Sequence, residues 1–329
     1  MTMQMRALGR TQKRLSALGF GCMGLVGWYG SRDDGEARAT LLEAIDRGVT
    51  HLDTAATYQL GANERFVGET IRGRRDQVFL ATKCGLSRGP DGTAFVDNKP
   101  STINASCDES LQRLGVDYID LFYLHRIDKT VPIEESTGAL SRLVAQGKIR
   151  HAGLSECSAD TLRRACKVHP IAAVQSEYSI WTRDPEQGVL AACRELGVGF
   201  VPYSPLGRGF LAGNIRNLAD LPADDIRRHQ PRFQGANLER NLRIADTIRD
   251  LGRRKHATAA QIAIAWVLAQ GDDLLPIPGM KSRAHLNDNL GALDVRFSKA
   301  ELDELNATMA RTPVQGERYP PGMLQALDR

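Results

Sequence analysis

The chain repeats one unit eight times: a short apolar run typical of a β-strand, followed by the apolar spacing of an amphipathic helix. Strict alternation of strands and helices predicts a parallel sheet, because each crossover helix covers a sheet face. Eight units in 329 residues favour a closed (β/α)8 TIM barrel over an open, doubly wound sheet. The strands are expected at residues 17–21, 50–53, 78–82, 118–124, 149–154, 171–175, 198–202 and 273–277.

Segments outside the repeat predict an N-terminal β-hairpin, extra helices and long loops. Residues 3–16 read as two short strands around a turn. The segment 84–99 is expected to be a loop because Gly, Pro and Asp cluster in it, and Ser101 is the expected N-cap of a helix over 102–114. The remaining parts of this single domain, residues 1–329, are expected to be a loop at 204–237, a tail at 310–329, and helices at 34–46, 63–72, 133–146, 159–168, 185–196, 238–255, 259–269, 282–291 and 298–309.

Composition and charge narrow the class of protein. The chain is 42% hydrophobic and 25% charged, which is typical of a globular protein with a large core. A net charge of +4 predicts neither a nucleic-acid partner nor an anionic membrane. The start of the chain lacks the apolar core of a signal peptide, which predicts a cytoplasmic protein. The six cysteines form no CxxC pair, so reduced thiols are expected rather than a zinc site or disulfides.

One stretch matches a nucleotide-binding pattern. Gly19-Phe-Gly-Cys-Met-Gly24 fits GxGxxG, which in Rossmann folds cradles a pyrophosphate. A Rossmann loop opens directly into a helix, whereas residues 25–31 intervene here and the first helix is expected near Asp33-Asp34. The pattern alone therefore does not predict a Rossmann domain.

Polar residues stand at or near the ends of three expected strands. Asp53, Lys83 and His125 each finish an apolar run, and Tyr58 follows Asp53 by five residues. Barrel active sites form where the carboxyl ends of the strands meet. Singly, these side chains have structural explanations: a strand-end cap, a solvated amine, a core histidine and a loop aromatic. Together they favour an active site.

Seven segments carry a family resemblance. They are Leu18-Gly-Phe-Gly-Cys-Met-Gly, Asp53-Thr-Ala-Ala-Thr-Tyr58, Leu124-His125-Arg126, Gly153-Leu-Ser155-Glu156, Gln175-Ser-Glu-Tyr178-Ser, Tyr203-Ser-Pro-Leu-Gly-Arg-Gly-Phe-Leu211 and Pro276-Ile-Pro-Gly-Met-Lys-Ser-Arg283. With these segments in this order, the chain resembles the aldo-keto reductase superfamily along nearly its whole length. Within the superfamily it is most similar to the single-barrel, NADPH-dependent reductases related to perakine and pyridoxal reductases.

The resemblance implies reduction of aldehydes or ketones to alcohols and assigns roles to the four polar residues. Tyr58 matches the general acid, and Lys83 and Asp53 match the pair that tunes it. A phenol with an ordinary pKa of about 10 is a weak acid at neutral pH, and a nearby ammonium lowers that pKa. His125 matches the donor that orients the carbonyl.

The resemblance also implies where NADPH or NADP⁺ binds. Ser155 and Gln175 match positions that hold the nicotinamide carboxamide, and Tyr203 matches the aromatic that stacks on the nicotinamide ring. Glu156 stands where many members carry Asn, and a carboxylate accepts hydrogen bonds from an amide but donates none. The implied cofactor residues are Gly21, Met23, Ser155, Gln175, Tyr203, Ser204, Leu206, Gly207, Arg208, Gly279, Lys281, Ser282, Arg283, His285, Asp288 and Asn289.

Within this set, the segment 276–291 matches the adenosine-phosphate site. Lys281, Ser282 and Arg283 suit a ribose 2′-phosphate at a helix start, which predicts a preference for NADPH over NADH. Met280 stands where a hydroxyl residue is common, so one phosphate contact is expected to be missing.

Three aromatic residues on expected loops are candidate walls of a pocket for a small-molecule carbonyl substrate: Trp28, Tyr29 and Trp181. Loop packing is the alternative for each of them. Two other functions fit the same residues. One is a cofactor-binding redox sensor or regulatory subunit with slow turnover, and the other is a barrel aldolase with Lys83 as a Schiff-base amine.

Overall fold

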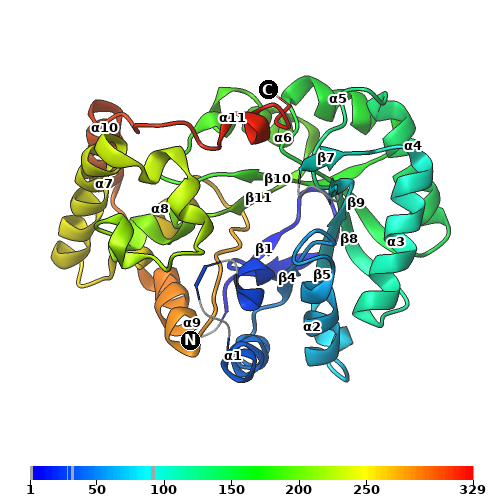
Figure 1. Ribbon diagram of the computed structural model, residues 1–329, viewed down its shortest axis with the longest axis horizontal. Coiled ribbons are helices and arrows are strands. Elements are labelled where there is room, and N and C mark those ends of the chain that lie inside the picture. The colour runs from blue at the N-terminus through cyan, green and yellow to red at the C-terminus, as the bar shows by residue number, and fades with distance from the viewer. Residues whose placement is uncertain (1–2, 28, 31–32, 90–92, 329) are drawn as a thin grey trace.

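Seven parallel strands form the central sheet of the computed structural model, which describes residues 3–27, 29–30, 33–89 and 93–328 (Figure 1). The strands are hydrogen-bonded in the order β11-β10-β9-β8-β5-β4-β3. Each strand of this sheet therefore lies beside the sheet strands that precede and follow it in the chain. The strands are β3 (Phe20–Gly21), β4 (His51–Asp53), β5 (Phe79–Cys84), β8 (Ile119–Leu124), β9 (Ile149–Ser155), β10 (Ile171–Glu177) and β11 (Gly199–Tyr203).

An eighth extended segment, residues 274–279, closes the sheet into a barrel. On one side Leu275 and Ile277 donate backbone hydrogen bonds to β11 at 2.9 and 3.0 Å. On the other side Gly19 and Gly21 donate to the carbonyls of Pro276 and Pro278. The bridges here are isolated rather than continuous, because the two prolines have no N–H to give to a ladder. The expected (β/α)8 barrel is therefore confirmed, with an irregular eighth strand.

Helices surround this barrel, α2 to α5 on one side and α7, α8 and α10 on the other (Figure 1). Side-chain caps fix several helix starts, including Asp33 before α1 and the capping box of Thr258 and Gln261 at α8. No helix among the described residues is long and apolar enough to cross a membrane. The helices are α1 (Asp34–Asp46), α2 (Ala62–Thr70), α3 (Pro100–Leu114), α4 (Ile133–Ala145), α5 (Ala159–Val168), α6 (Val189–Leu196), α7 (Gly235–Arg254), α8 (Ala259–Leu268), α9 (Arg283–Gly291), α10 (Lys299–Arg311) and α11 (Pro321–Leu324).

The expected N-terminal hairpin closes the bottom of the barrel. Strands β1 (Met5–Ala7) and β2 (Arg14–Ser16) pair antiparallel, and Leu8 and Leu15 join the apolar cluster inside the barrel. Gly9 has a φ of +52°, and a Cβ there would lie 2.5 Å from the backbone nitrogen of Gly199. Only glycine lets the hairpin approach the barrel this closely.

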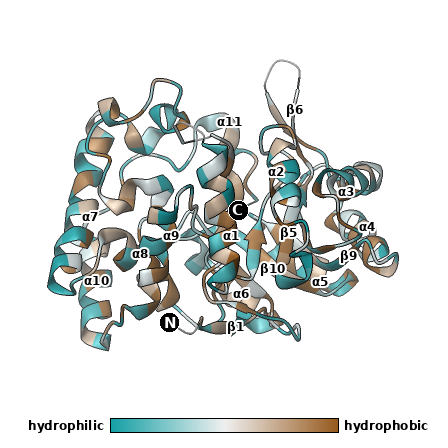
Figure 2. Cartoon of the chain, turned by 90° about the horizontal axis from the view of Figure 1, so that it is seen from below, coloured by the Kyte–Doolittle hydropathy of each residue, from teal (hydrophilic) through white to brown (hydrophobic). Residues whose placement is uncertain are grey.

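Two sequence expectations were wrong in detail. The segment expected as a loop, 84–99, contains an antiparallel hairpin of β6 (Leu86–Arg88) and β7 (Ala94–Val96), which projects from the body in Figure 2. Three-residue strands around a Gly/Pro turn carry too little periodicity to predict. Ser101 does not cap α3, because the helix begins two residues earlier than expected, at Pro100, and proline is favoured in the first turn.

The GxGxxG segment serves barrel closure instead of opening a Rossmann helix. Gly21 ends β3, and the five residues Cys22–Val26 form a 3₁₀ helix. A Cβ on Gly21 would lie 2.7 Å from the carbonyl oxygen of Ile277, so glycine is needed where the closing segment crosses. The carboxyl ends of β4, β5 and β8 now share one face of the barrel.

Candidate active site

Asp53 and Lys83 form a buried ion pair at the ends of adjacent strands β4 and β5. Lys83 Nζ donates to Asp53 Oδ1 at 2.5 Å and to the Thr54 carbonyl at 2.7 Å. The second oxygen of Asp53 accepts from Gln175 Nε2 at 2.7 Å. Because both side chains are almost fully buried, these contacts fix the position of the amine rather than leaving it in water.

Tyr58 and His125 lie beside this pair. Their rings meet edge to face with centroids 5.9 Å apart, and Lys83 Nζ lies 5.3 Å from the centre of the Tyr58 ring. His125 directly follows β8, and its backbone N–H bonds to the carbonyl of Cys84 at the end of β5. The fold thus brings Tyr58 together with the three residues that the sequence placed at strand ends, Asp53, Lys83 and His125.

Burial controls the protonation of this group. It raises the pKa of Tyr58 well above its ordinary value, and the Asp53 carboxylate adds to the rise. It lowers the pKa of Lys83, which the same carboxylate opposes, and lowers the pKa of His125 well below its ordinary value. Desolvation and Asp53 set the direction of the Tyr58 pKa in this structure, and the expected effect of Lys83 on the phenolate stays a prediction. A protonated phenol and a neutral imidazole face the cavity.

Two adjoining cavities open at this face of the barrel. The first, of ≈ 480 Å³, is bounded by the β6–β7 hairpin and the C-terminal tail, and we call it the tail cavity. The second, of ≈ 390 Å³, extends to the start of α9, and we call it the α9 cavity. Both have the volume of small-molecule sites. The residues lining both cavities are Met23, Tyr29, Tyr58, Gln175, Tyr203, Ser204 and Arg208.

The expected nicotinamide residues line the tail cavity, and Gln175 and Tyr203 also line the α9 cavity. Ser155 ends β9, and its buried Oγ has no hydrogen-bond partner among the described residues; Gln175 lies beside it on β10. An unpartnered buried hydroxyl is costly unless a ligand satisfies it. Ser155 and Gln175 therefore suit an amide group that both donates and accepts.

Glu156 is occupied by the chain's own donors. Its carboxylate accepts from the backbone N–H of Glu177 at 2.9 Å, from the hydroxyl of Tyr203 at 2.8 Å, and from Arg318 at 2.6 Å. Burial works to raise the pKa of Glu156, but Arg318 and Arg126 outweigh it, so that pKa lies below its ordinary value. This carboxylate orients Tyr203 and the C-terminal tail.

The two cations near the start of α9 have different surroundings. Lys281 lines the α9 cavity, and its Nζ donates to the Tyr29 carbonyl at 2.8 Å. Arg283 does not line the cavity, because its side chain pairs with Glu36 of α1 at 3.0 Å. Ser282 caps the helix by accepting from the His285 N–H, as expected. Other expected cofactor residues that line the α9 cavity are Gly21, Leu206, Gly279, His285, Asp288 and Asn289, whereas Gly207 does not line it.

The three aromatic candidates have different positions. Tyr29 lines both cavities, and Trp28 lies outside the described residues. Trp181 is not a pocket wall, which corrects the sequence expectation. It is buried and stacks on Phe210 with centroids 4.7 Å apart, and Phe233 packs against its edge. The long loop 204–237 supplies both phenylalanines, so its folding covers the indole.

Sequence reasoning missed the walls contributed by distant segments. The β6–β7 hairpin supplies Leu86 and Val96 to the tail cavity, and the C-terminal tail supplies Tyr319 and Met323. No periodicity marks these segments, so only the folded chain reveals them. Arg126 also lines this cavity, and its place directly after His125 at a strand end was the available signal.

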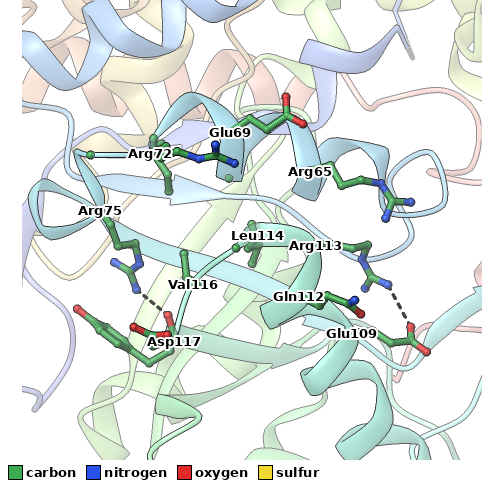
Figure 3. A pocket seen from close by; sticks show the side chains of 15 residues that line it. Arg65, Glu69, Arg72, Arg75, Glu109, Gln112, Arg113, Leu114, Val116 and Asp117 are labelled. Atoms are coloured by element: carbon green, nitrogen blue, oxygen red, sulfur yellow. Dashed lines mark hydrogen bonds and ion pairs between the residues drawn. The ribbon is translucent and has the colours of Figure 1, made fainter.

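A third hollow, of ≈ 640 Å³, lies where α2 and α3 end and β5 and β8 begin (Figure 3). We call it the α2–α3 groove. Four arginines line it: Arg65, Arg72, Arg75 and Arg113. None of the four expected catalytic residues lines this groove, so it is separate from the two cavities at the other end of the barrel.

Comparison with known proteins agrees with this geometry. Residues 17–310 match the aldo/keto reductase family. The chain is 46% identical over 312 residues to the aldo-keto reductase yakc [NADP(+)] of Schizosaccharomyces pombe, covering 93% of this chain and 92% of that one. It is 44% identical over 320 residues to the probable aldo-keto reductase 1 of Glycine max, covering 96% of this chain and 92% of that protein.

Solved structures give the same picture. The glycerol dehydrogenase AKR11B4 from Gluconobacter oxydans superposes with a TM-score of 0.85 at 27% identity, covering 98% of this chain and 99% of that one. The thermostable aldo-keto reductase Tm1743 superposes with a TM-score of 0.74 at 30% identity, covering 93% and 99%. The chain therefore belongs to the aldo/keto reductase family.

Proposed function

We propose that the protein reduces aldehydes or ketones to alcohols with NADPH, and that Tyr58 is the general acid. The observation that carries this proposal is the buried Asp53–Lys83 pair beside Tyr58 and His125, at a face where a cavity admits a small molecule. The family of the chain supports an oxidoreductase. A place near the perakine and pyridoxal reductases within the family stays a prediction.

The proton chemistry follows from the protonation states. Carbonyl reduction adds a hydride to carbon, which bound NADPH supplies, and a proton to oxygen. Tyr58 retains its proton in this buried site and is within reach of the tail cavity, so it is suited to give that proton to the developing alkoxide. Neutral His125 lines the same cavity and orients the carbonyl oxygen by donating a hydrogen bond.

Lys83 then acts on the phenolate that remains. Two of its three N–H groups are held by Asp53 and Thr54, which positions the ammonium near the Tyr58 ring. An ammonium in a site of low dielectric stabilises a nearby anion strongly. Proton loss from Tyr58 is therefore favoured once charge develops on the substrate oxygen, rather than in the resting enzyme.

The chain's own groups support NADPH as the cofactor. The unpartnered Ser155 Oγ and the Gln175 amide suit the carboxamide, and the Tyr203 ring stands at the junction of the two cavities. The α9 cavity, with Lys281 at its far end, suits the adenosine phosphate. The Schizosaccharomyces pombe relative carries NADP(+) in its name.

The two alternatives differ in what they need. An aldolase needs an amine that a substrate carbonyl can reach, whereas the Lys83 side chain is fully buried and does not line either cavity. A regulatory subunit needs the same cofactor residues but slow chemistry, so turnover separates it from a reductase.

The test is steady-state oxidation of NADPH, followed by absorbance, with a panel of aldehydes, α-dicarbonyls and quinones. The reductase is expected to turn over at least one aldehyde in a range typical of enzymes, roughly 1–10³ per second. Lys83→Met is the matched control, and it is expected to keep NADPH binding while losing most of the rate. Slow oxidation with every substrate, unchanged by Lys83→Met, would favour the regulatory function.

A further inference from the structure

Arg126 is a buried cation at the wall of the tail cavity. It follows His125 directly and is only 6% exposed, yet it lines the cavity together with Tyr58 and His125. One of its N–H groups donates to the carbonyl of His125 at 2.7 Å, and another reaches the hydroxyl of Tyr319 at 3.5 Å. A guanidinium has five N–H donors. Three of them have no acceptor among the residues that the structure describes.

No carboxylate in the described part of the chain forms an ion pair with Arg126. Three acidic side chains at this face of the barrel have other partners: Asp53 binds Lys83, Glu156 binds Arg318 at 2.6 Å, and Glu177 lies 3.4 Å from Arg208. Glu156 acts on Arg126 through space only. Burying a charge without a partner is expensive, so a guanidinium in this position calls for an anion that the chain does not provide.

The lining of the tail cavity repeats this imbalance. Among the described residues around it are two arginines, Arg126 and Arg208, but no aspartate or glutamate. Arg208 also lines the α9 cavity and donates to the Gln230 side chain at 2.6 Å, so it is shared with the cofactor side. Arg126 lines the tail cavity and not the α9 cavity, which points to the substrate rather than the cofactor as its partner.

We propose that Arg126 binds an acid group of the substrate, so that the preferred substrates are small carbonyl compounds carrying a carboxylate or phosphate. This proposal rests on the proposed reductase function. The carbonyl lies against Tyr58 and His125, and the acid group lies against Arg126, whose planar donor fork suits bidentate oxygen pairs. The hydroxyl of Tyr319 in the C-terminal tail accepts a hydrogen bond from Arg126 and helps to hold the guanidinium at the cavity wall.

Matched substrates test the proposal. The wild-type enzyme is assayed with 4-carboxybenzaldehyde and with its uncharged methyl ester, and 2- and 3-carboxybenzaldehyde vary the distance between carbonyl and acid. At least one carboxylate is expected to exceed the neutral ester in kcat/KM by about ten- to a hundredfold, the effect of one charge-assisted hydrogen-bonded contact. 4-Formylphenyl phosphate in the same series distinguishes phosphate from carboxylate recognition.

Variants assign the effect to Arg126. Arg126→Met is expected to lower the ratio of kcat/KM for acid over ester to near one, mainly through KM, and Arg126→Lys is expected to retain part of it. NADPH binding measured by fluorescence shows that each variant is folded. Arg150→Met is the matched control, because Arg150 packs on the Tyr118 ring outside the cavity, and it is expected to leave the ratio unchanged.

Two outcomes overturn the proposal. One is a wild-type enzyme that shows no preference for any acid over its ester, and the other is an Arg126→Met enzyme that keeps the preference. Calorimetric binding of benzoate and of benzamide to the NADP⁺ complex tests the anion site without turnover. If benzoate binds, Arg126→Met weakens that binding, and the enzyme reduces no aldehyde, then the reductase function is wrong but the anion site stands.

Discussion

The two ends of the barrel both carry arginine-lined hollows, and they differ in how the charge is balanced. In the α2–α3 groove, Arg113 binds Glu64 and Glu109, and Arg75 binds the Asp120 carboxylate at 2.6 Å. Figure 3 shows the pair of Arg113 and Glu109. In the tail cavity, Arg126 has no carboxylate partner among the described residues. Two of the four groove arginines are therefore neutralised by the chain's own carboxylates, whereas the buried Arg126 is not.

Charge balance distinguishes a structural hollow from a candidate binding site better than the volume of the hollow does. The ion pairs of Arg75 and Arg113 at the amino ends of β5 and β8 are complete within the chain and need no ligand. At the carboxyl ends, Ser155 Oγ has no hydrogen-bond partner among the described residues, and Arg126 keeps N–H donors that have no acceptor there. Where such unsatisfied polar groups line a cavity, a ligand can complete their hydrogen bonds.

The largest expected effect is at the catalytic end. Tyr58→Phe is expected to lower kcat by roughly a hundred- to ten-thousandfold, the usual contribution of a positioned general acid, while the free energy of unfolding changes little. The checks are steady-state kinetics with an aldehyde that the wild type reduces and urea unfolding of both proteins. Near-normal turnover in a chemistry-limited assay would remove Tyr58 from the mechanism.

The barrel and the strand-end residues were predictable because they depend on local patterns. Asp53, Lys83 and His125 end apolar runs, and parallel strands bring such ends together whatever the loops do. The tail cavity was not predictable in the same way. Its walls come from segments far apart in sequence, and Trp181 shows the risk, since it is covered by a loop that carries no periodicity.

Which charges have a partner within the chain could not be predicted from the sequence either. Arg126 and Arg113 look alike in the chain, and only the fold shows that one lies beside Glu64 and the other beside a cavity. The same holds for the pKa of Tyr58, which depends on burial more than on the neighbouring Lys83. Residue identities predicted the chemistry, but not which charges the chain itself neutralises.

The next largest effect is expected in the groove. Arg113→Met leaves the fully buried Glu64 carboxylate with only the Thr82 hydroxyl, so stability is expected to fall by about 3 kcal/mol while kcat/KM stays within twofold. Urea unfolding and steady-state kinetics measure the two effects. The control is Arg65→Met, which removes an exposed groove arginine that makes no ion pair with a described residue. A large loss of activity in folded Arg113→Met would show that the groove is functional too.

The barrel interior between the two ends offers a smaller test. His51 is fully buried with neither ring nitrogen bonded to a described residue, and burial lowers its pKa to about 4. Below an ordinary pKa of about 6.5 the unfolded chain binds a proton at His51, which the folded chain cannot do until pH 4. Stability contributed at this site is therefore lost as pH falls from 6.5 towards 4, about 2 kcal/mol between pH 7 and pH 5.

His51→Leu is expected to reduce the difference in unfolding free energy between pH 7 and pH 5 by that amount, whatever its effect at pH 7. Urea unfolding at both pH values measures it. His256→Asn is the control, because His256 has a φ of +53°, which asparagine tolerates, and lies outside the barrel interior. An unchanged pH dependence in His51→Leu would mean that the buried imidazole takes up a proton as readily as an exposed one.

The smallest effect is expected at the start of α9, where Arg283 is paired with a carboxylate and Lys281 lines a cavity. Lys281 lines the α9 cavity, whereas Arg283 is bound to Glu36, whose carboxylate also accepts from the Arg283 backbone N–H at 2.8 Å. Lys281→Ala is expected to reduce the preference for NADPH over NADH about tenfold, and Arg283→Ala by less than threefold.

Glu36→Gln frees Arg283 and is expected to strengthen NADPH binding without a matching change for NADH. Dissociation constants for both cofactors, measured by fluorescence quenching, decide the point. If Arg283→Ala costs as much as Lys281→Ala, the Glu36 pair opens when the phosphate binds, and a cation paired in the free protein is not thereby excluded from function.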